Sequence, residues 1–235
     1  MVRVERTGEE MLKAASSFTF LSTGSPAFDR LLGGGLREGR LVEFFGRSNS
    51  GKSQLAMQAV LFAAKSGARS LYIDTEGGFR PERLDEMAKA RGWKVEGLLD
   101  RVVYVRCDSS SEQMETVRSM QTQGATRSCR LVVVDTLTRN FTIDMPGMAN
   151  LQSRQAALDV HLSEMARDAF INSRAYLLTN RVTFGAVHDV RIGGQTVEQL
   201  VDDSVRLEKA GTNISGTLMR NGESAQGSLG KSGVG

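Results

Sequence analysis

The sequence predicts an α/β fold in which a mostly parallel central sheet is flanked by helices. Apolar runs of strand length alternate with segments of helical periodicity along most of the chain. One of these runs leads directly into a glycine-rich turn and then a helix. Two later runs end in the carboxylates Asp74 and Asp135. Because open α/β sheets bind ligands at the carboxyl ends of their strands, these features indicate a site at one edge of the sheet.

The composition is that of an ordinary globular protein. At 235 residues, 40% apolar and 24% charged, the chain is long enough for one sizeable core. A net charge of +3 argues only weakly for a nucleic-acid partner, so that case depends on where the charges lie. No long apolar run follows the charged N-terminus, which predicts a cytoplasmic protein without a membrane partner. Cys107 and Cys129 lack the paired spacing of a zinc or redox site and are interpreted as core thiols.

Three parts are expected along the chain. Residues 1–21 form a lead-in segment with a helical pattern from Gly8 to Ala15. Residues 22–210 form the main core, which opens with a capped helical turn and the glycines at 33–35 that let the chain reverse. Seven of the last 25 residues are glycine, which predicts a weakly ordered tail over 211–235.

The first core strand, expected over 41–45, is followed by a phosphate-loop motif and a helix over 54–65. The motif consists of Gly46, Arg47, Ser48, Asn49, Ser50, Gly51, Lys52 and Ser53. Glycine lets the backbone pass close to a ligand, so amides around the end of the loop can point at phosphate oxygens. The helix that begins there adds its positive dipole end. We expect Lys52 to reach the outer phosphates of a nucleoside triphosphate and the Ser53 hydroxyl to bind Mg²⁺.

The second strand, over 70–74, places acids at the same edge of the sheet. Glu76 follows it closely and is the candidate base, with Pro81 opening the next helix. The alternative for Glu76 is an acid that only favours a helix start through the dipole.

A third strand over 102–106 precedes a Ser-capped helix over 111–123. The fourth, over 131–135, has four consecutive apolar residues, which predicts burial on both faces, and ends in Asp135, a candidate magnesium-ordering acid.

The second half of the chain continues the alternation. A long connection over 136–150 contains Arg139, and a long amphipathic helix is expected over 151–171. His161 lies beside the apolar face of that helix and is interpreted as structural. A fifth strand over 176–180 ends in Asn180, and residues 181–194 are expected to form a basic loop that can contact a nucleic-acid backbone or simply be solvated. Residues 204–209 alternate as an edge strand does.

Several short motifs, taken together, resemble the RecA-fold recombinases of archaea and eukaryotes. They are Ser22–Ser25, Leu31–Gly35, Glu43–Gly46, Asp74–Gly77 with Phe79–Leu84, Ser153–Gln155, Thr179–Asn180 and Ile192–Gly194. The resemblance covers residues 7 to about 209. The chain has no room for that family's N-terminal helical DNA-binding domain, so it looks most like the short archaeal paralogs of RadB type.

The resemblance implies a RecA-like ATPase core and a role for each matching residue. Lys52 and Ser53 match the phosphate and magnesium residues, Asp135 the magnesium-ordering acid, and Glu76 the base that activates the attacking water. Arg83 matches an arginine that packs on adenine. Asn180 lies in the segment that senses the terminal phosphate and relays its state to a DNA-binding loop.

This chain also departs from the family pattern. Arg181 stands where the family usually has Gln; it can stabilise charge but cannot accept a hydrogen bond. The family's polymerisation motif would fall near residues 5–8, where Glu5 replaces an aromatic, so self-assembly into filaments by that route is not expected. The first DNA-facing loop, around 144–151, has no basic residue before Arg154, which argues against stand-alone strand exchange.

The expected function is therefore a DNA repair and homologous recombination ATPase, slow and possibly stimulated by DNA, that acts as a recombinase paralog or mediator. Its expected partners are single-stranded DNA, through Arg139, Arg154, Arg181 and Arg191, and a full-length recombinase or other repair proteins. Two alternatives stay open. One is an interaction module switched by ATP with negligible turnover, and the other is a KaiC-like signalling ATPase, which shares the glycine-rich entry but not the pattern of residues 74–84.

Overall fold

Strands and helices alternate along the computed structural model, which describes residues 7–120, 124–183, 189–220 and 222–235. The helices are α1 Gly8–Ser17, α2 Pro26–Leu31, α3 Lys52–Lys65, α4 Pro81–Ala90, η1 Leu99–Arg101 (a 3-10 turn), α5 Ser110–Ser119, α6 Gly124–Arg127, α7 Arg139–Asp144, α8 Leu151–Asn172 and α9 Gly194–Leu200. The strands are β1 Phe20–Leu21, β2 Leu36–Arg37, β3 Leu41–Gly46, β4 Arg69–Asp74, β5 Val102–Arg106, β6 Cys129–Asp135, β7 Ala175–Thr183, β8 Val190–Arg191, β9 Asp203–Ala210, β10 Asn213–Leu218, β11 Ser224–Gly230 and β12 Gly233–Val234.

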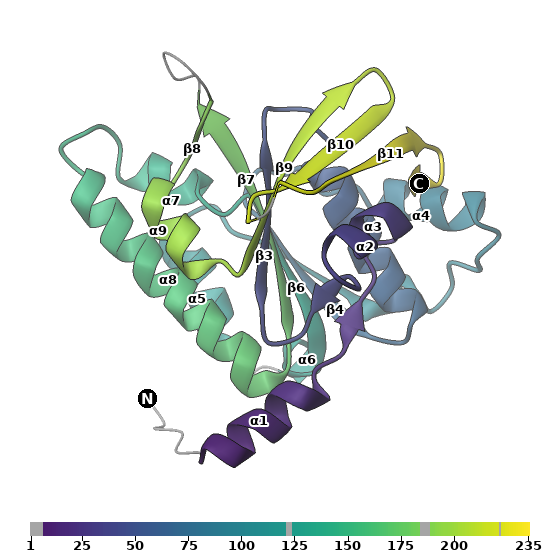
Figure 1. Ribbon diagram of the computed structural model, residues 1–235, viewed down its shortest axis with the longest axis horizontal. Helices are drawn as coiled ribbons and strands as arrows, with labels where there is room; N and C mark the ends of the chain where they lie inside the picture. Colours follow the sequence, from purple (N-terminus) through teal and green to yellow (C-terminus); the bar gives the residue numbers. More distant parts are fainter. Residues whose placement is uncertain (1–6, 121–123, 184–188, 221) are drawn as a thin grey trace.

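One large sheet forms the centre of the molecule, with strand order β12-β11-β10-β9-β3-β7-β6-β4-β5 (Figure 1). The pairs from β9 across to β5 are all parallel, whereas β10, β11 and β12 add antiparallel strands at one side. Helices α3 and α4 lie on one face, and α5, α7, α8 and α9 lie on the other (Figure 1). The predicted class, a mostly parallel sheet flanked by helices, is confirmed.

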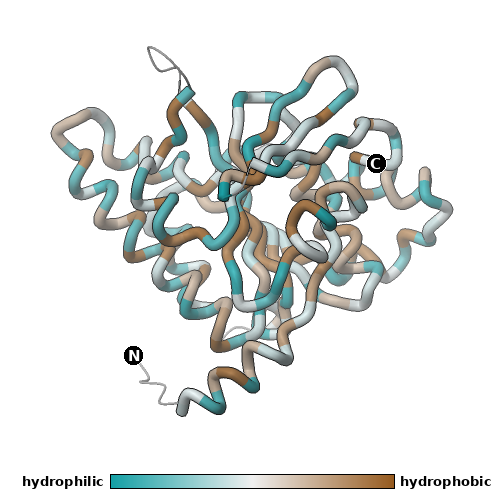
Figure 2. Tube along the Cα trace, viewed as in Figure 1, coloured by the Kyte–Doolittle hydropathy of each residue, from teal (hydrophilic) through white to brown (hydrophobic). Residues whose placement is uncertain are grey.

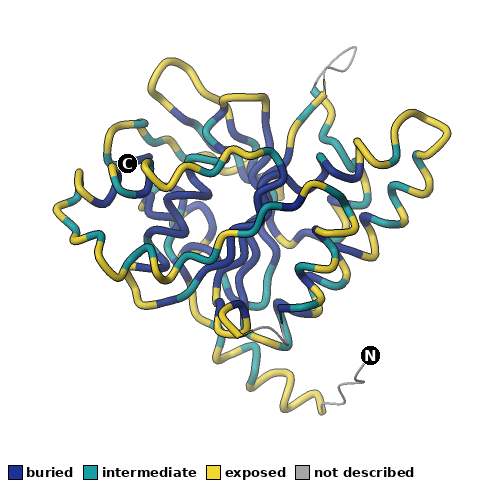
Figure 3. Tube along the Cα trace, turned by 180° about the vertical axis from the view of Figure 1, so that it is seen from behind, coloured by how far each residue is buried: buried dark blue, intermediate teal, exposed yellow. Residues whose placement is uncertain are grey.

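The two faces of the sheet bury separate hydrophobic clusters. In β6, Leu131 and Val133 join the cluster with α3, whereas Val132 and Val134 join the cluster with α8. Side chains alternate between the faces of a strand, so a strand covered on both sides needs an unbroken apolar run. The hydropathy and burial views both show this layering, with apolar and buried chain at the centre (Figures 2 and 3).

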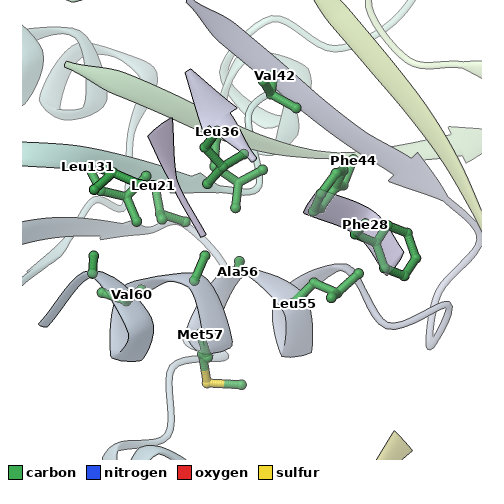
Figure 4. Close-up of a cluster of buried hydrophobic side chains, with 14 of the residues drawn as sticks. Leu21, Phe28, Leu36, Val42, Phe44, Leu55, Ala56, Met57, Val60 and Leu131 are labelled. Atoms are coloured by element: carbon green, nitrogen blue, oxygen red, sulfur yellow. The ribbon is translucent and has the colours of Figure 1, made fainter. Parts of the chain in front are cut away.

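Packing against the central sheet fixes the position of α3, the helix that follows the phosphate loop. Leu55, Ala56 and Val60 lie on its sheet-facing side, below strand residues that include Phe44 and Leu131 (Figure 4). All five side chains are fully buried. Because a close-packed interface of this kind resists displacement, the start of α3 is held at a fixed place relative to β3.

The strand register brings the predicted site residues to one edge. Asp74 pairs with Asp135 across β4 and β6, and Gly46 pairs with Arg181 across β3 and β7. Residues that follow these strands must therefore lie close together in space, although they are far apart in the sequence. This edge is the carboxyl end of the parallel strands, as expected for a ligand site.

Four expectations about individual elements differ from the structure. The connection over 136–150 contains a helix, α7, which buries Phe141. The basic loop over 181–194 is partly strand, because β7 continues to Thr183 and pairs with β8. Strand β9 is not at the edge, since β3 and β10 flank it. Finally, most of 211–235 is ordered as β10, β11 and β12, because alternate residues such as Ile214 and Leu218 are buried.

Helix α1, near the N-terminus of the chain, projects from the rest of the molecule (Figures 1 and 3). It begins at a capping box formed by Thr7 and Glu10, and none of its residues is buried. Residues 5 and 6 of the expected polymerisation motif lie outside the described residues, so that prediction stays open. None of the helices described has the length and apolar character needed to cross a membrane.

Candidate functional site

The phosphate loop connects β3 to α3 through two glycines with no space for a side chain. Gly51 has φ of 98°, and a Cβ there would lie 2.4 Å from Cδ1 of Ile214. A Cβ on Gly46 would lie 2.3 Å from the Leu207 carbonyl oxygen. Gly51 also serves as the N-cap of α3, so the free amides at the start of that helix border the loop. The loop therefore has the backbone form that a phosphate site requires.

Lys52 folds back onto the loop. Its Nζ donates to the carbonyl oxygens of Gly46 (3.0 Å) and Arg47 (2.7 Å) and to Ser50 Oγ (3.2 Å). Burial lowers the pKa of Lys52 to about 8, against the attraction of Asp135, and the charge of Arg181 lowers it further. An anion in the loop would favour the charged amine further, because it would place a negative charge next to Nζ.

Arg47 contributes its carbonyl to this arrangement, while its side chain points elsewhere. The guanidinium makes a two-pronged contact with Asp189, at 2.6 and 3.0 Å. Both residues line a pocket of about 600 Å³ on the outer side of the loop, together with Arg206 and Lys209. The Arg47 side chain is thus part of the pocket wall, and the loop binds Lys52 through two backbone carbonyl oxygens and the Ser50 hydroxyl.

Asp135 lies at the end of β6 and faces the start of α3. Its carboxylate accepts hydrogen bonds from Ser53 Oγ (3.2 Å), Tyr72 OH (2.5 Å) and Thr179 Oγ1. The side chain is almost completely buried, and burial raises the pKa of Asp135 despite the opposing effect of these three hydroxyls. The predicted pair of Ser53 and Asp135 is therefore in direct contact.

This oxygen set is chemically suited to Mg²⁺. Magnesium prefers hard oxygen ligands and usually shares one or two carboxylates with substrate phosphates and water. Ser53 and Asp135 supply a hydroxyl and a carboxylate 3.2 Å apart, beside the loop amides. Among the described residues, no three His, Cys, Asp or Glu side chains gather to hold a metal by themselves. An ion here would therefore depend on nucleotide phosphates for its remaining ligands, and it would neutralise their charge.

Glu76 is placed by a turn that a second acid organises. Asp74, fully buried at the end of β4, accepts backbone hydrogen bonds from four consecutive amides, those of Glu76 (2.9 Å), Gly77 (2.7 Å), Gly78 (3.2 Å) and Phe79 (3.0 Å). Burial alone would raise the pKa of Asp74, but the amides outweigh it and the pKa is lowered. A carboxylate held in this way fixes the turn, and with it the position of the candidate base.

Both carboxylate oxygens of Glu76 have partners. Oε1 accepts from Thr136 Oγ1 at 2.5 Å, and Oε2 forms an ion pair with the guanidinium of Arg181. The Glu76 side chain is 23% exposed and that of Arg181 is 48% exposed. The residue that departs from the family pattern thus contacts the candidate base directly.

A buried polar network lies behind Arg181. Asn180 Oδ1 accepts from the Arg181 amide (2.9 Å) and Thr138 Oγ1 (2.8 Å), while its Nδ2 donates to Glu43 Oε1 (2.8 Å). Glu43 is completely buried and also binds Arg191 at 2.5 Å. Arg191 is therefore paired inside the protein, with only 12% of its side chain exposed, rather than presented as a surface cation.

The other predicted arginines lie around the same edge. Arg139 donates to the Thr75 carbonyl at 2.7 Å, next to the Glu76 turn, and Arg154 on α8 donates to the Met145 carbonyl at 2.8 Å. Both are partly exposed. Their assignment to DNA, like that of Arg181 and Arg191, stays a prediction.

Arg83, the predicted adenine residue, connects the site to the C-terminal strands. On α4, its Nε donates to Gln54 Oε1 of α3 (3.0 Å) and its Nη2 to the Gly230 carbonyl (2.7 Å). Gln58 of α3 exchanges two hydrogen bonds with the backbone of Val234. The C-terminal strands therefore reach the helix that begins at the phosphate loop.

The sequence placed Asp74 at this edge but did not show that it organises the turn, and it missed Tyr72, Thr136 and Thr179 as partners of the acids. Thr179 follows an apolar run at the sheet edge, and that position is a signal which could have found it. Tyr72 lies inside a strand and gives no such signal, because only the pairing of β4 with β6 places it beside Asp135.

Comparisons with known proteins agree with this geometry. The sequence model of the Rad51 family matches residues 15–198. The DNA repair and recombination protein RadA of Ignicoccus hospitalis is 34% identical over 224 residues, which cover 88% of this chain and 68% of that protein. The RadA protein of Metallosphaera sedula is 34% identical over 220 residues, with the same coverage of 88% and 68%. The predicted resemblance to RecA-fold recombinases is confirmed: the chain belongs to the Rad51 family.

Proposed function

We propose that this protein binds ATP with Mg²⁺, hydrolyses it slowly and acts in DNA repair and homologous recombination. One observation carries the ATPase half of the proposal. Lys52 and Ser53 at the start of α3, Asp135 at the end of β6 and Glu76 after β4 lie at one edge of the sheet. Similarity to proteins named for DNA repair and recombination supports the biological setting.

The residues divide the chemistry between them. Lys52 and the amides of the loop bind the phosphates, and the partially buried site strengthens these contacts by excluding water. Ser53 and Asp135 hold the metal. Glu76 accepts the proton of the attacking water, as a general base within reach of the outer phosphate.

Two substitutions test this division. Lys52→Ala should reduce the affinity for ATP at least tenfold, because it removes the cation of the loop. Glu76→Gln should retain nucleotide binding and lower turnover by about 10²- to 10⁴-fold, the usual contribution of a general base. Titration calorimetry with AMP-PNP and ADP measures the first effect, and phosphate release measures the second. Lys65→Ala, an exposed lysine in the last turn of the same helix, is the matched control.

The DNA half of the proposal requires a separate assay. Fluorescence polarisation of a labelled single-stranded oligonucleotide, with and without ATP, should show binding that weakens steeply as salt rises, because phosphate contacts release counterions. Replacing Arg154 by Gln should lower the slope of log K against log salt by about one if it contacts a phosphate. Absence of binding at low salt would remove DNA from the proposal and leave the ATPase intact.

One observation favours an interaction module that ATP switches with little turnover. The candidate base is already occupied by Arg181 and Thr136, and this arrangement is suited to binding without fast hydrolysis. Loss of function in Lys52→Ala together with full function in Glu76→Gln would support the switch. The KaiC-like alternative receives no comparable support, since the match over 15–198 is to the Rad51 family.

The finer assignment is also a proposal. We infer a paralog or mediator of RadB type, because Glu5 disfavours self-assembly and the first loop, which has no basic residue before Arg154, disfavours stand-alone strand exchange. Its partners would be a full-length recombinase or other repair proteins, and the interaction would take place in the cytoplasm. Pull-down of a purified full-length recombinase, compared with strand exchange by this protein alone, tests that assignment.

A further inference from the structure

Two cations lie near the candidate phosphate site, Lys52 at the start of α3 and Arg181 in β7. Lys52 donates to the carbonyl oxygen of Gly46, and Gly46 is the residue that pairs with Arg181 across β3 and β7. Two nearby positive groups repel one another, and a polyanion between them would relieve that repulsion.

The backbone of Arg181 is held by a hydrogen bond, whereas its side chain is partly exposed. Its amide donates to Asn180 Oδ1, and Asn180 is held in turn by Thr138 and Glu43. The side chain, in contrast, is 48% exposed, and its guanidinium is paired with Glu76. Because the backbone of Arg181 is held, its long side chain can exchange one anionic partner for another without any movement of the sheet.

The pairing changes what Glu76 can do. One of its oxygens accepts from Thr136 and the other from Arg181, so both oxygens already accept hydrogen bonds from protein groups. A general base must lie within hydrogen-bond reach of the proton that it removes. As long as both contacts persist, Glu76 is poorly placed for this step.

We propose that Arg181 is a positioning residue: its ion pair withholds Glu76, and Glu76 is released when Arg181 moves to the outer phosphate of a bound triphosphate. The inference rests on the proposed ATP site and deepens it. A phosphate oxygen competes well for a guanidinium, since bidentate charge-assisted hydrogen bonds suit both anions. A diphosphate lacks the outer group and should leave the ion pair in place.

A double-mutant cycle on nucleotide affinity tests the exchange. Glu76→Gln breaks the ion pair and frees Arg181, so it should tighten AMP-PNP binding about five- to tenfold in the otherwise wild-type protein. In an Arg181→Gln background the same change should have no such effect. Affinity for ADP should change less than twofold throughout. Titration calorimetry measures all four proteins with both nucleotides, in the presence of Mg²⁺.

The controls separate this exchange from a structural ion pair. Arg80 is exposed and donates to the Gly77 carbonyl of the same turn, so Arg80→Gln removes a nearby charge without touching Glu76. It should leave the effect of Glu76→Gln on AMP-PNP unchanged. A purely structural pair would couple the two residues in thermal stability but not in the preference for AMP-PNP over ADP. That result would overturn this inference and leave the proposed function intact. If the wild-type protein bound neither nucleotide, the proposed function and this inference would both fall.

Discussion

Asp74 shows how one buried carboxylate shapes the candidate site. It lies two residues before Glu76 and contacts no predicted phosphate ligand, yet it accepts the four amides that define the turn. Hydrogen bonds to a charged group are worth more than neutral ones, about 1.5–3 kcal/mol, and the unpaired amides would be left partly buried. The position of the candidate base therefore depends on a residue with no chemical role of its own.

Replacing Asp74 by Ala should lower the free energy of unfolding by about 2–4 kcal/mol, because a buried charged acceptor with several partners is lost. The same change should reduce ATP turnover, with little effect on nucleotide affinity, since Lys52 and the loop are untouched. Urea unfolding and phosphate release measure the two effects. Asp108→Ala provides the control, because that acid is 70% exposed. Equal loss of stability in both variants would contradict the role given to Asp74.

At the scale of elements, the C-terminal strands are an integral layer of the site. The sequence of 211–235, with its seven glycines, predicts weak order. In the structure, however, Gly216 lets β10 approach Phe28 and Gly233 lets β12 approach Gln58. Glycine here permits close packing, a use that composition alone does not distinguish from flexibility.

Ile214 in β10 tests this layer, because its side chain is completely buried against Gly51 of the phosphate loop. Ile214→Ala should cost about 2–5 kcal/mol of stability through the cavity that it leaves. It should also weaken nucleotide binding, since the loop loses its support. Met219, 51% exposed just after the same strand, is the control site, and Met219→Ala should change little. A tail that was weakly ordered would give the same result at both positions.

At the scale of the whole molecule, stability should depend on pH through His161. This histidine is completely buried, and burial, together with the charge of Arg118, lowers its pKa to about 3. The unfolded chain binds a proton near pH 6.5, whereas the folded protein does not. Below that pH the unfolded state gains protons, so stability should fall as the pH decreases from about 6.5 toward 3, by up to about 1.4 kcal/mol per unit.

Urea unfolding at pH 7 and pH 5 measures this dependence. The wild-type protein should lose about 2 kcal/mol more than His161→Gln over that interval, because the other titrating groups are common to both proteins. The comparison therefore isolates His161 from Asp74 and Asp135, whose pKa values are shifted in opposite directions. Parallel loss in the two proteins would show that His161 does not carry the effect.

The sequence by itself determined the sheet and much of the candidate site. Buried parallel strands need unbroken apolar runs such as 131–134, and a phosphate loop needs Gly51 where the backbone is left-handed, so both leave a local signature. The fold class and the family follow from such signatures. The contact of Ser53 with Asp135 follows from the same reasoning, because parallel strands deliver their ends to one edge.

Only the tertiary structure decided which partners these groups have. Arg181 and Glu76 are 105 residues apart in the chain, and no local pattern says that one guanidinium will pair with the base or that Arg191 will be buried on Glu43. The order of the C-terminal strands also depends on surfaces of α2, α3 and β9 that exist only in the folded protein. Long-range pairing and burial have no signature within a short window of sequence, because the free energy that fixes them comes from contacts between distant residues, which form only as the chain folds.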